Sequence, residues 1–241
     1  MFSTLLYALE NGVATITLNR PDARNALNGA MCEELRSAAA AAAADENVRV
    51  VFVRGNGPVF CAGADVKERP GMSEDQVRAR RLKGFAAYHA LESLPMPAIA
   101  VVQGAALGSG VEIAAACDFI VATPDAVFGT PEALRGTVGA TQRLPRVLGK
   151  RLAKDLMFTG RRLSAAEAQA AGFVSRVVEQ EKLEHALANI SQCVMIAPPE
   201  VMRMAKQCID RGVELDPRSA LGLELMAIEE QLASGKWMGK T

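Results

Sequence analysis

The sequence of 241 residues has little histidine, few aromatic residues and no excess of charge of either sign. Its two histidines, His89 and His185, do not stand near a matching motif, so a Ser-His hydrolase is not expected. Lysine plus arginine and aspartate plus glutamate each number 27, which makes the formal net charge zero. A balanced chain gives no electrostatic reason to expect nucleic acid or an anionic membrane as a partner.

Cysteine is scarce, and its spacing excludes some kinds of site. The five cysteines form no C-x-x-C pair, and no group of histidines and cysteines has zinc spacing. An odd number of scattered cysteines favours reduced thiols. We therefore expect a cytoplasmic protein without a metal ion.

Long hydrophobic runs are also absent. The apolar stretch over 97–122 is interrupted by Gln103, three glycines and Glu112, and is too broken to span a bilayer. The beginning, "MFSTLLYALENG", lacks the basic start and the apolar core of a signal peptide. The sequence predicts no membrane association.

The common phosphate-binding and nucleophile motifs fail. Gly149-Lys150 is followed by Arg151, which breaks a P-loop, and Ile113 replaces the third glycine of a dinucleotide fingerprint. Leu107 replaces the first glycine of a nucleophile elbow around Ser109. What remains is chemistry performed by carboxylates and backbone amides.

What the sequence contains is an α/β pattern over its first two-thirds. Strands are predicted for "GVATITL", "VRVVFVRG", "AIAVVQG" and "DFIVA". Helices are predicted after Asn28 and Ser73, which can cap them, and a short helix from about Ser109. From about Thr141 the sequence indicates mainly helices, divided by a short strand "FVSRVV".

The segment "GSGVE" places a carboxylate beside exposed backbone. Ser109 falls in the first helical turn, where its N–H is free to bind a developing oxyanion. Glu112 is three residues further on and therefore lies on the same helix face. Burying an unpaired carboxylate is unfavourable, so it usually serves a purpose. The alternative is that Glu112 only complements the helix dipole.

Two other segments have the same character. In "FCAGADVKE", Gly63 leaves the backbone open, although a plain turn in which Asp65 bonds its own backbone is the alternative. Cys61 in this segment is interpreted as a small packing residue. In "FGTPEALRG", Pro131 predicts a helix start with Glu132 in its first turn, where dipole complementation is again the alternative.

Taken in order, these blocks resemble the crotonase superfamily, also called the enoyl-CoA hydratase/isomerase family. The resemblance covers nearly the whole chain, including "LNRPDARNALN", "FCAGADVKE", "PAIAVVQGAALGSGVEIAAACDFIVA", "FGTPEALRGT", "TQRLPRVLG", "FTGRRLSAAEAQAAGFVSRVV" and "APPEVMRMAKQCID". The run "CAGADVKERPGMSEDQV" is especially similar to the methylglutaconyl-CoA hydratase branch. The loop before Thr141 and the end "EEQLASGKWMGKT" are short for this family.

The resemblance implies a fold and an assembly. The expected α/β fold is a crotonase-like spiral of ββα units over 1–180, followed by a C-terminal helical region over 181–241. That helical region would build a homotrimer or a hexamer. Some members of the branch bind RNA through a lysine-rich helix. The matching stretch here, Asn28 to Glu46, has no lysine, so no nucleic-acid partner is expected.

The resemblance also implies an acyl-CoA thioester as substrate and partner, with no cofactor beyond the coenzyme A of the substrate itself. The amides of Ala64 and Ser109 would form an oxyanion hole around the thioester oxygen. The CoA channel would be lined by Ala64, Asp65, Val66 and Lys67. Arg24 and Lys67 would either contact CoA phosphates or be solvated surface charges.

By the same resemblance, Glu112 would orient and deprotonate water, while Glu132 would supply a proton to the α-carbon. The implied enzyme is an enoyl-CoA hydratase, a lyase of fatty-acid metabolism. It adds water reversibly, in syn geometry, to a trans-2-enoyl-CoA and gives a 3-hydroxyacyl-CoA. A Δ3–Δ2 enoyl-CoA isomerase or another enolate-forming enzyme would use mainly Glu132. A catalytically silent acyl-CoA-binding or scaffold protein is the third interpretation.

Overall fold

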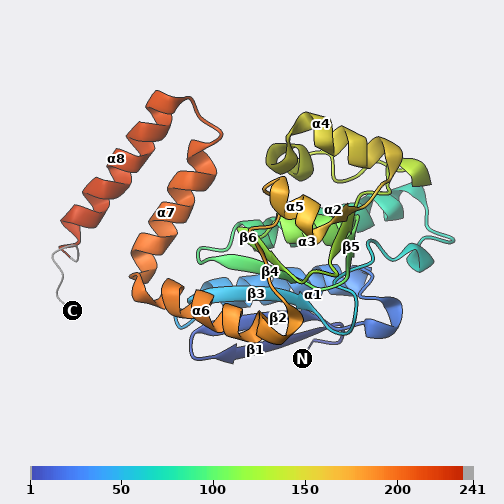
Figure 1. The fold of residues 1–241 in the computed structure, drawn as a ribbon, viewed down its shortest axis with the longest axis horizontal. Helices are drawn as coiled ribbons and strands as arrows, with labels where there is room; N and C mark the ends of the chain where they lie inside the picture. Colours follow the sequence, from blue (N-terminus) through green and yellow to red (C-terminus); the bar gives the residue numbers. More distant parts are fainter. Residues whose placement is uncertain (1, 236–241) are drawn as a thin grey trace.

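The computed structural model describes residues 2–235, which form a six-stranded sheet surrounded by helices (Figure 1). The sheet has the order β1-β2-β3-β4-β6-β9. Its strands are β1 (Leu5–Glu10), β2 (Val13–Leu18), β3 (Val50–Gly55), β4 (Ala98–Val102), β6 (Phe119–Ala122) and β9 (Arg176–Val177). β1 and β2 pair antiparallel, and the other neighbours pair parallel. The prediction of an α/β fold is confirmed.

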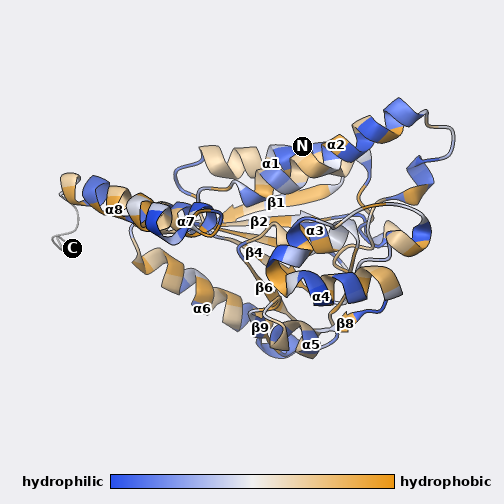
Figure 2. Cartoon of the chain, turned by 90° about the horizontal axis from the view of Figure 1, so that it is seen from above, coloured by the Kyte–Doolittle hydropathy of each residue, from blue (hydrophilic) through white to orange (hydrophobic). Residues whose placement is uncertain are grey.

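Helices cover both faces of this sheet (Figure 2). α1 (Gly29–Ala44) and α2 (Glu74–Glu92) lie on one side, and α6 (Leu183–Ile196) lies on the other. Successive side chains of a strand point to opposite faces. Accordingly, Val51 and Val53 of β3 join the core beneath α1, whereas Val50 and Phe52 pack with α6. Burial on both faces explains the continuous apolar runs of β3 and β4.

Capping side chains fix where the two long helices begin. The Asn28 side chain accepts a hydrogen bond of 2.8 Å from the Met31 amide at the start of α1. Ser73 and Gln76 form a reciprocal capping box at the start of α2. Both predicted helix starts are confirmed.

A second sheet was not predicted from the sequence. Its three strands, in the order β5-β7-β8, are β5 (Ala105–Leu107), β7 (Val127–Gly129) and β8 (Leu163–Ser164). Strands of two or three residues are too short to show an alternating pattern. The helix α3 (Ser109–Ala115) leaves this small sheet and begins at the predicted residue. α4 (Arg143–Thr159) and α5 (Ala165–Ala170) follow β7 and β8.

The last two helices extend away from the rest of the molecule (Figure 1). They are α7 (Pro199–Gly212) and α8 (Pro217–Ala233), and within these fully described helices no residue is buried. An ion pair of 2.9 Å between Lys206 Nζ and Asp118 Oδ2 ties α7 to the beginning of β6. The short ending predicted for the chain lies partly outside the described residues.

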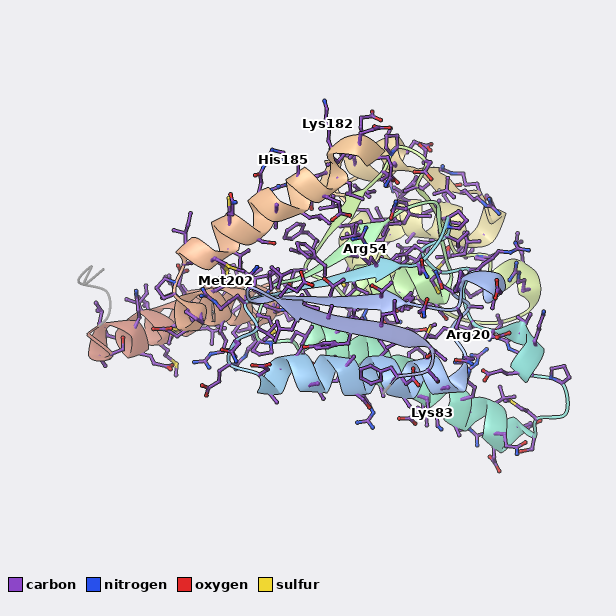
Figure 3. All side chains as sticks on the ribbon, turned by 90° about the horizontal axis from the view of Figure 1, so that it is seen from below. Arg20, Arg54, Lys83, Lys182, His185 and Met202 are labelled. Carbon is purple, nitrogen blue, oxygen red and sulfur yellow. The ribbon has the colours of Figure 1, made fainter. Side chains whose placement is uncertain are left out.

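The helix α6 belongs to the packed layers rather than to the extended pair. Leu183 and Leu187 on its inner face are buried against the sheet, whereas Lys182 and His185 point away from it (Figure 3). The predicted helical region over 181–241 would include α6, and the division of the chain after residue 180 stays a prediction.

Among residues 2–235, no helix has the length and apolar character needed to cross a bilayer.

Candidate functional site

A cavity of about 280 Å³ opens between α2, α3 and the loop that follows β7. Its size is close to the lower limit for small-molecule pockets. The predicted site residues that line it are Ala64, Asp65, Val66, Ser109, Glu112 and Glu132. Lys67 and Arg24 do not line this cavity, and their contact with CoA phosphates stays a prediction.

The backbone around Ala64 is held between two neighbouring segments. Cys61 pairs with β5, since its N–H donates to the Ala105 carbonyl and its carbonyl accepts from Leu107. On the opposite edge, Leu27 donates to the Gly63 carbonyl at 2.8 Å and accepts from the Asp65 amide at 2.9 Å. In such a parallel pairing, the residue between the two bonded ones points its own N–H away. The Ala64 amide therefore faces away from Leu27.

The Ser109 amide lies next to the same segment. A Cβ built on Gly63, whose φ is +103°, would lie 3.9 Å from the Ser109 nitrogen. As the first residue of α3, Ser109 has no acceptor within the helix. Within residues 2–235, neither the Ala64 nor the Ser109 N–H donates to a backbone or side-chain oxygen. The cavity wall thus carries two amides that are free to bind a ligand.

Glu112 is a buried carboxylate with a cationic partner. Its residue is 6% exposed, and its amide closes the first turn of α3 on the Gly108 carbonyl. Arg143, at the start of α4, donates from Nη1 to Glu112 Oε2 at 3.0 Å. An exposed carboxylate in the first turn is enough to complement the helix dipole. The buried ion pair of Glu112 with Arg143, from another helix, therefore goes beyond dipole complementation.

Arg143 lies in the block "TQRLPRVLG", and the sequence alone did not identify it as a site residue. Its Nε and Nη2 donate to both carboxylate oxygens of Glu92, at 3.2 and 2.7 Å. Its guanidinium lies 5.8 Å from the centroid of the Tyr88 ring. Burial lowers the pKa of Arg143, but Glu92 and then Glu112 outweigh it and raise that pKa overall. Arginine is common at the start of a polar helix, so the sequence gives no signal that Arg143 contacts Glu112.

Glu132 occupies a different environment from Glu112. Its Oε1 lies 2.6 Å from the place that a Cβ of Gly108 would take, so only glycine permits this approach. Its Oε2 is buried, and no residue among 2–235 donates a hydrogen bond to it. Burial raises the pKa of Glu132, and the negative charge of Glu112 adds to this. A hydrogen bond from its own backbone and the charge of Arg135 lower the pKa, but the net shift is upward. The surroundings favour the neutral acid.

The prediction for the backbone at Glu132 needs a correction. Glu132 does not lie in the first turn of an α-helix, because it immediately precedes a single 3-10 turn, Ala133–Arg135. The chain leaves this turn at Gly136, whose φ of +67° ends the helical path. The side chain nevertheless reaches the cavity.

Asp65 and Cys61 have mainly structural contacts. The Asp65 side chain accepts from the Lys67 amide at 3.0 Å and from Arg20 at 2.9 Å. Burial raises the pKa of Asp65, but the hydrogen bonds from Arg20 and Lys67 outweigh burial, so the pKa lies below its usual value. Cys61 is fully buried, and burial raises the pKa of its thiol to about 12. A buried neutral thiol agrees with the interpretation of Cys61 as a packing residue. No group of His, Cys, Asp and Glu within residues 2–235 is arranged to hold a metal ion.

The sequence is similar to a known protein family and to several of its members. The family model for "Enoyl-CoA hydratase/isomerase" matches residues 8–237. The chain is 45% identical over 223 residues to enoyl-CoA hydratase domain-containing protein 2, mitochondrial, of Bos taurus, covering 88% of this chain and 75% of that protein. It is 37% identical over 221 residues to human methylglutaconyl-CoA hydratase, mitochondrial, covering 88% and 65%.

Solved structures match the fold over nearly the whole chain. A crystal structure of enoyl-CoA hydratase from Bacillus anthracis superposes with a TM-score of 0.91 at 38% identity, covering 94% of this chain and 90% of that one. A putative enoyl-CoA hydratase from Thermobifida fusca, solved in complex with acetoacetyl-CoA, superposes with a TM-score of 0.87 at 27% identity. This second match covers 96% of this chain and 95% of the Thermobifida fusca chain.

Proposed function

Because the chain belongs to the enoyl-CoA hydratase/isomerase family, we propose that it is an enoyl-CoA hydratase. It adds water reversibly, in syn geometry, to a trans-2-enoyl-CoA and forms a 3-hydroxyacyl-CoA. The observation that carries this proposal is the cavity that joins two free amides to two carboxylates in unlike surroundings. Pairs of carboxyl groups with divergent environments are the usual arrangement for acid and base roles.

The two amides supply the electrostatic part of the mechanism. The N–H groups of Ala64 and Ser109 bind the thioester oxygen, and they bind it more tightly as negative charge develops there. Withdrawing electrons through this oxygen makes the β-carbon electrophilic and the α-carbon able to take a proton. Each such donor typically contributes about 3 kcal/mol to transition-state stabilisation.

The carboxylates supply the proton transfers. Arg143 holds Oε2 of Glu112, and within residues 2–235 no donor contacts Oε1. That oxygen accepts a proton from water as the water attacks the β-carbon. Glu132, whose pKa is raised by burial, delivers a proton to the α-carbon. In the reverse direction the two groups exchange these tasks.

The substrate is an acyl-CoA thioester. The known structure with acetoacetyl-CoA supports this class of ligand for the fold. We assign Ala64, Asp65 and Val66 to the wall of the CoA channel because they line the cavity. The exposed cations Lys67 and Arg24 are proposed contacts for the CoA phosphates outside it.

Self-association as a homotrimer or hexamer is proposed for α7 and α8. Large apolar side chains on these helices are exposed, including Ile209 at 65%, Leu225 at 53% and Met226 at 72%. Isolated exposed apolar residues are ordinary, but exposed apolar residues that recur along two neighbouring helices indicate an interaction surface.

The cysteines bear on where the protein is located. All five are free thiols. On this basis we further propose that the protein is located in a reducing compartment, the cytoplasm.

The experiment that tests the function follows absorbance of the conjugated enoyl thioester. Hydration of crotonyl-CoA removes this absorbance, whereas isomerisation of a 3-enoyl-CoA creates it. A hydratase shows the first change at a useful rate. An isomerase shows mainly the second, and a silent CoA-binding protein shows neither while its unfolding temperature still rises with acyl-CoA.

A further inference from the structure

We infer that Arg143, held in place by Glu92, is a positioning residue that orients the Glu112 carboxylate toward the reacting water. This inference rests on the proposed function and deepens it. It assigns a role to two charged residues outside the carboxylate pair. Three elements meet in the arrangement, because Glu92 ends α2, Glu112 lies in α3 and Arg143 begins α4.

The hydrogen bonds leave the guanidinium little freedom. One edge, formed by Nε and Nη2, donates to Oε1 and Oε2 of Glu92 at 3.2 and 2.7 Å. The remaining Nη1 donates to Glu112 Oε2 at 3.0 Å. A guanidinium is planar and its donors are fixed in a fork. Binding the Glu92 edge therefore sets the direction in which Nη1 meets Glu112.

Burial decreases from the cavity outward along this chain of charges. The exposed fractions of the side chains are 8% for Glu112, 19% for Arg143 and 46% for Glu92. Tyr88, a residue that is 5% exposed, places its ring beside the guanidinium and also lines the cavity. Arg143 is consequently packed against a rigid ring as well as bonded on two sides.

This arrangement distinguishes the two oxygens of Glu112. Oε2 is engaged by Arg143, whereas within residues 2–235 Oε1 has no hydrogen-bond partner. A carboxylate without this contact would be free to rotate about its terminal torsion, which is broad and roughly two-fold. Fixing one oxygen presents the other to the cavity in a constant position, as general-base catalysis requires.

A purely structural role is the competing explanation. Arg143 would then only neutralise a buried carboxylate, and its loss would destabilise the fold without a specific link to Glu112 chemistry. The two roles differ in a double-mutant cycle. A residue that acts through Glu112 has little left to contribute once Glu112 has been replaced.

The test compares Arg143→Lys, Arg143→Gln and Glu92→Gln in the full chain, with Arg146→Gln as a matched control. Arg146 lies on the same helix and forms an exposed ion pair of 3.4 Å with Glu214. Lysine keeps the charge but cannot reproduce the fork. We expect kcat for crotonyl-CoA hydration to fall about tenfold to a hundredfold in Arg143→Lys and Arg143→Gln. The fall is smaller in Glu92→Gln, KM stays within about twofold throughout, and the control is unchanged.

The cycle with Glu112→Gln completes the test. We expect Arg143→Lys to lower kcat by less than about twofold in the Glu112→Gln background. Equal fold-losses in both backgrounds, or wild-type kcat in folded Arg143→Lys and Glu92→Gln, would overturn the inference while leaving the hydratase intact. If Arg143→Gln does not fold, the other two variants decide. A wild-type protein without hydration activity overturns the proposed function, and this inference with it.

Discussion

At the scale of single residues, Glu112 and Glu132 differ in what surrounds their oxygens. Glu112 has a cation within hydrogen-bond distance, whereas Glu132 has a buried oxygen without a donor and a raised pKa. An unpartnered buried acid is unfavourable when ionised. The protein therefore carries at Glu132 a stability defect that a neutral side chain would not have.

This defect predicts that Glu132→Gln stabilises the protein at neutral pH. Because the pKa of Glu132 is raised in the folded state above 4.5, folding stability declines as pH rises from that value through the folded pKa. The amide carries no charge and escapes this loss. We expect its Tm to exceed the wild-type Tm by about 2–4 °C near pH 7.5, the shift that corresponds to about 1 kcal/mol in a chain of this length.

Thermal unfolding of both proteins between pH 4 and pH 8 measures this difference, which should shrink toward pH 4. Glu167→Gln is the matched control, since hydrogen bonds from Ser164 lower the pKa of Glu167 and reverse the expected sign. A Glu132→Gln variant that melts below the wild type across the whole range would contradict this reasoning.

At the scale of secondary-structure elements, the site depends on how closely α3 approaches the segment 61–65. Gly110 in α3 faces the backbone of Cys61, and a Cβ at this position would collide with the Cys61 carbonyl oxygen. A backbone atom cannot move aside as a flexible side chain can. The approach sets the spacing of the Ala64 and Ser109 amides.

We therefore predict that Gly110→Ala impairs both folding and hydration. Forcing α3 away from the segment should lower the free energy of unfolding by about 1–3 kcal/mol and separate the two amides. Gly29→Ala is the control, because the nearest atom to its new Cβ lies at an ordinary 3.6 Å. Denaturant titration and the crotonyl-CoA assay measure the two effects. Wild-type values for Gly110→Ala in both would refute the proposed close contact.

Sequence reasoning succeeded where a local cause decides the structure. Asn28 and Ser73 mark helix starts because their side chains accept bonds from nearby amides. Ser109 begins α3 directly after Gly108, whose φ of +51° favours glycine. It failed at the small β5-β7-β8 sheet, whose pairing is set by distant segments.

The candidate site shows the same limit. The segments that carry Ala64, Ser109, Glu112 and Glu132 could be found from their glycines and carboxylates, and their joint placement followed only from the family resemblance. Arg143 could not be found, because its importance comes from Glu92 and Glu112, which lie 51 and 31 residues away in the sequence.

At the scale of the whole molecule, α7 and α8 extend away from the packed layers (Figure 1), and large apolar side chains on both helices are exposed. We predict that Leu225→Asp combined with Ile209→Asp abolishes self-association, since each aspartate would be buried unpaired in the interface. Light scattering after size exclusion should give a monomer for this variant and an oligomer for the wild type. Leu6→Asp, at a similarly exposed residue of β1, should remain oligomeric. An unchanged mass for the double variant would exclude this surface.

The most direct test of the account measures crotonyl-CoA hydration by Glu112→Gln and Glu132→Gln. Each variant removes one proton-transfer group and leaves the amides of Ala64 and Ser109 in place. We predict that each lowers kcat by about 10²–10⁴-fold, as loss of a general acid or base does, while acetoacetyl-CoA still raises its unfolding temperature as in the wild type. Hydration within a few-fold of the wild-type rate in either variant would contradict the account.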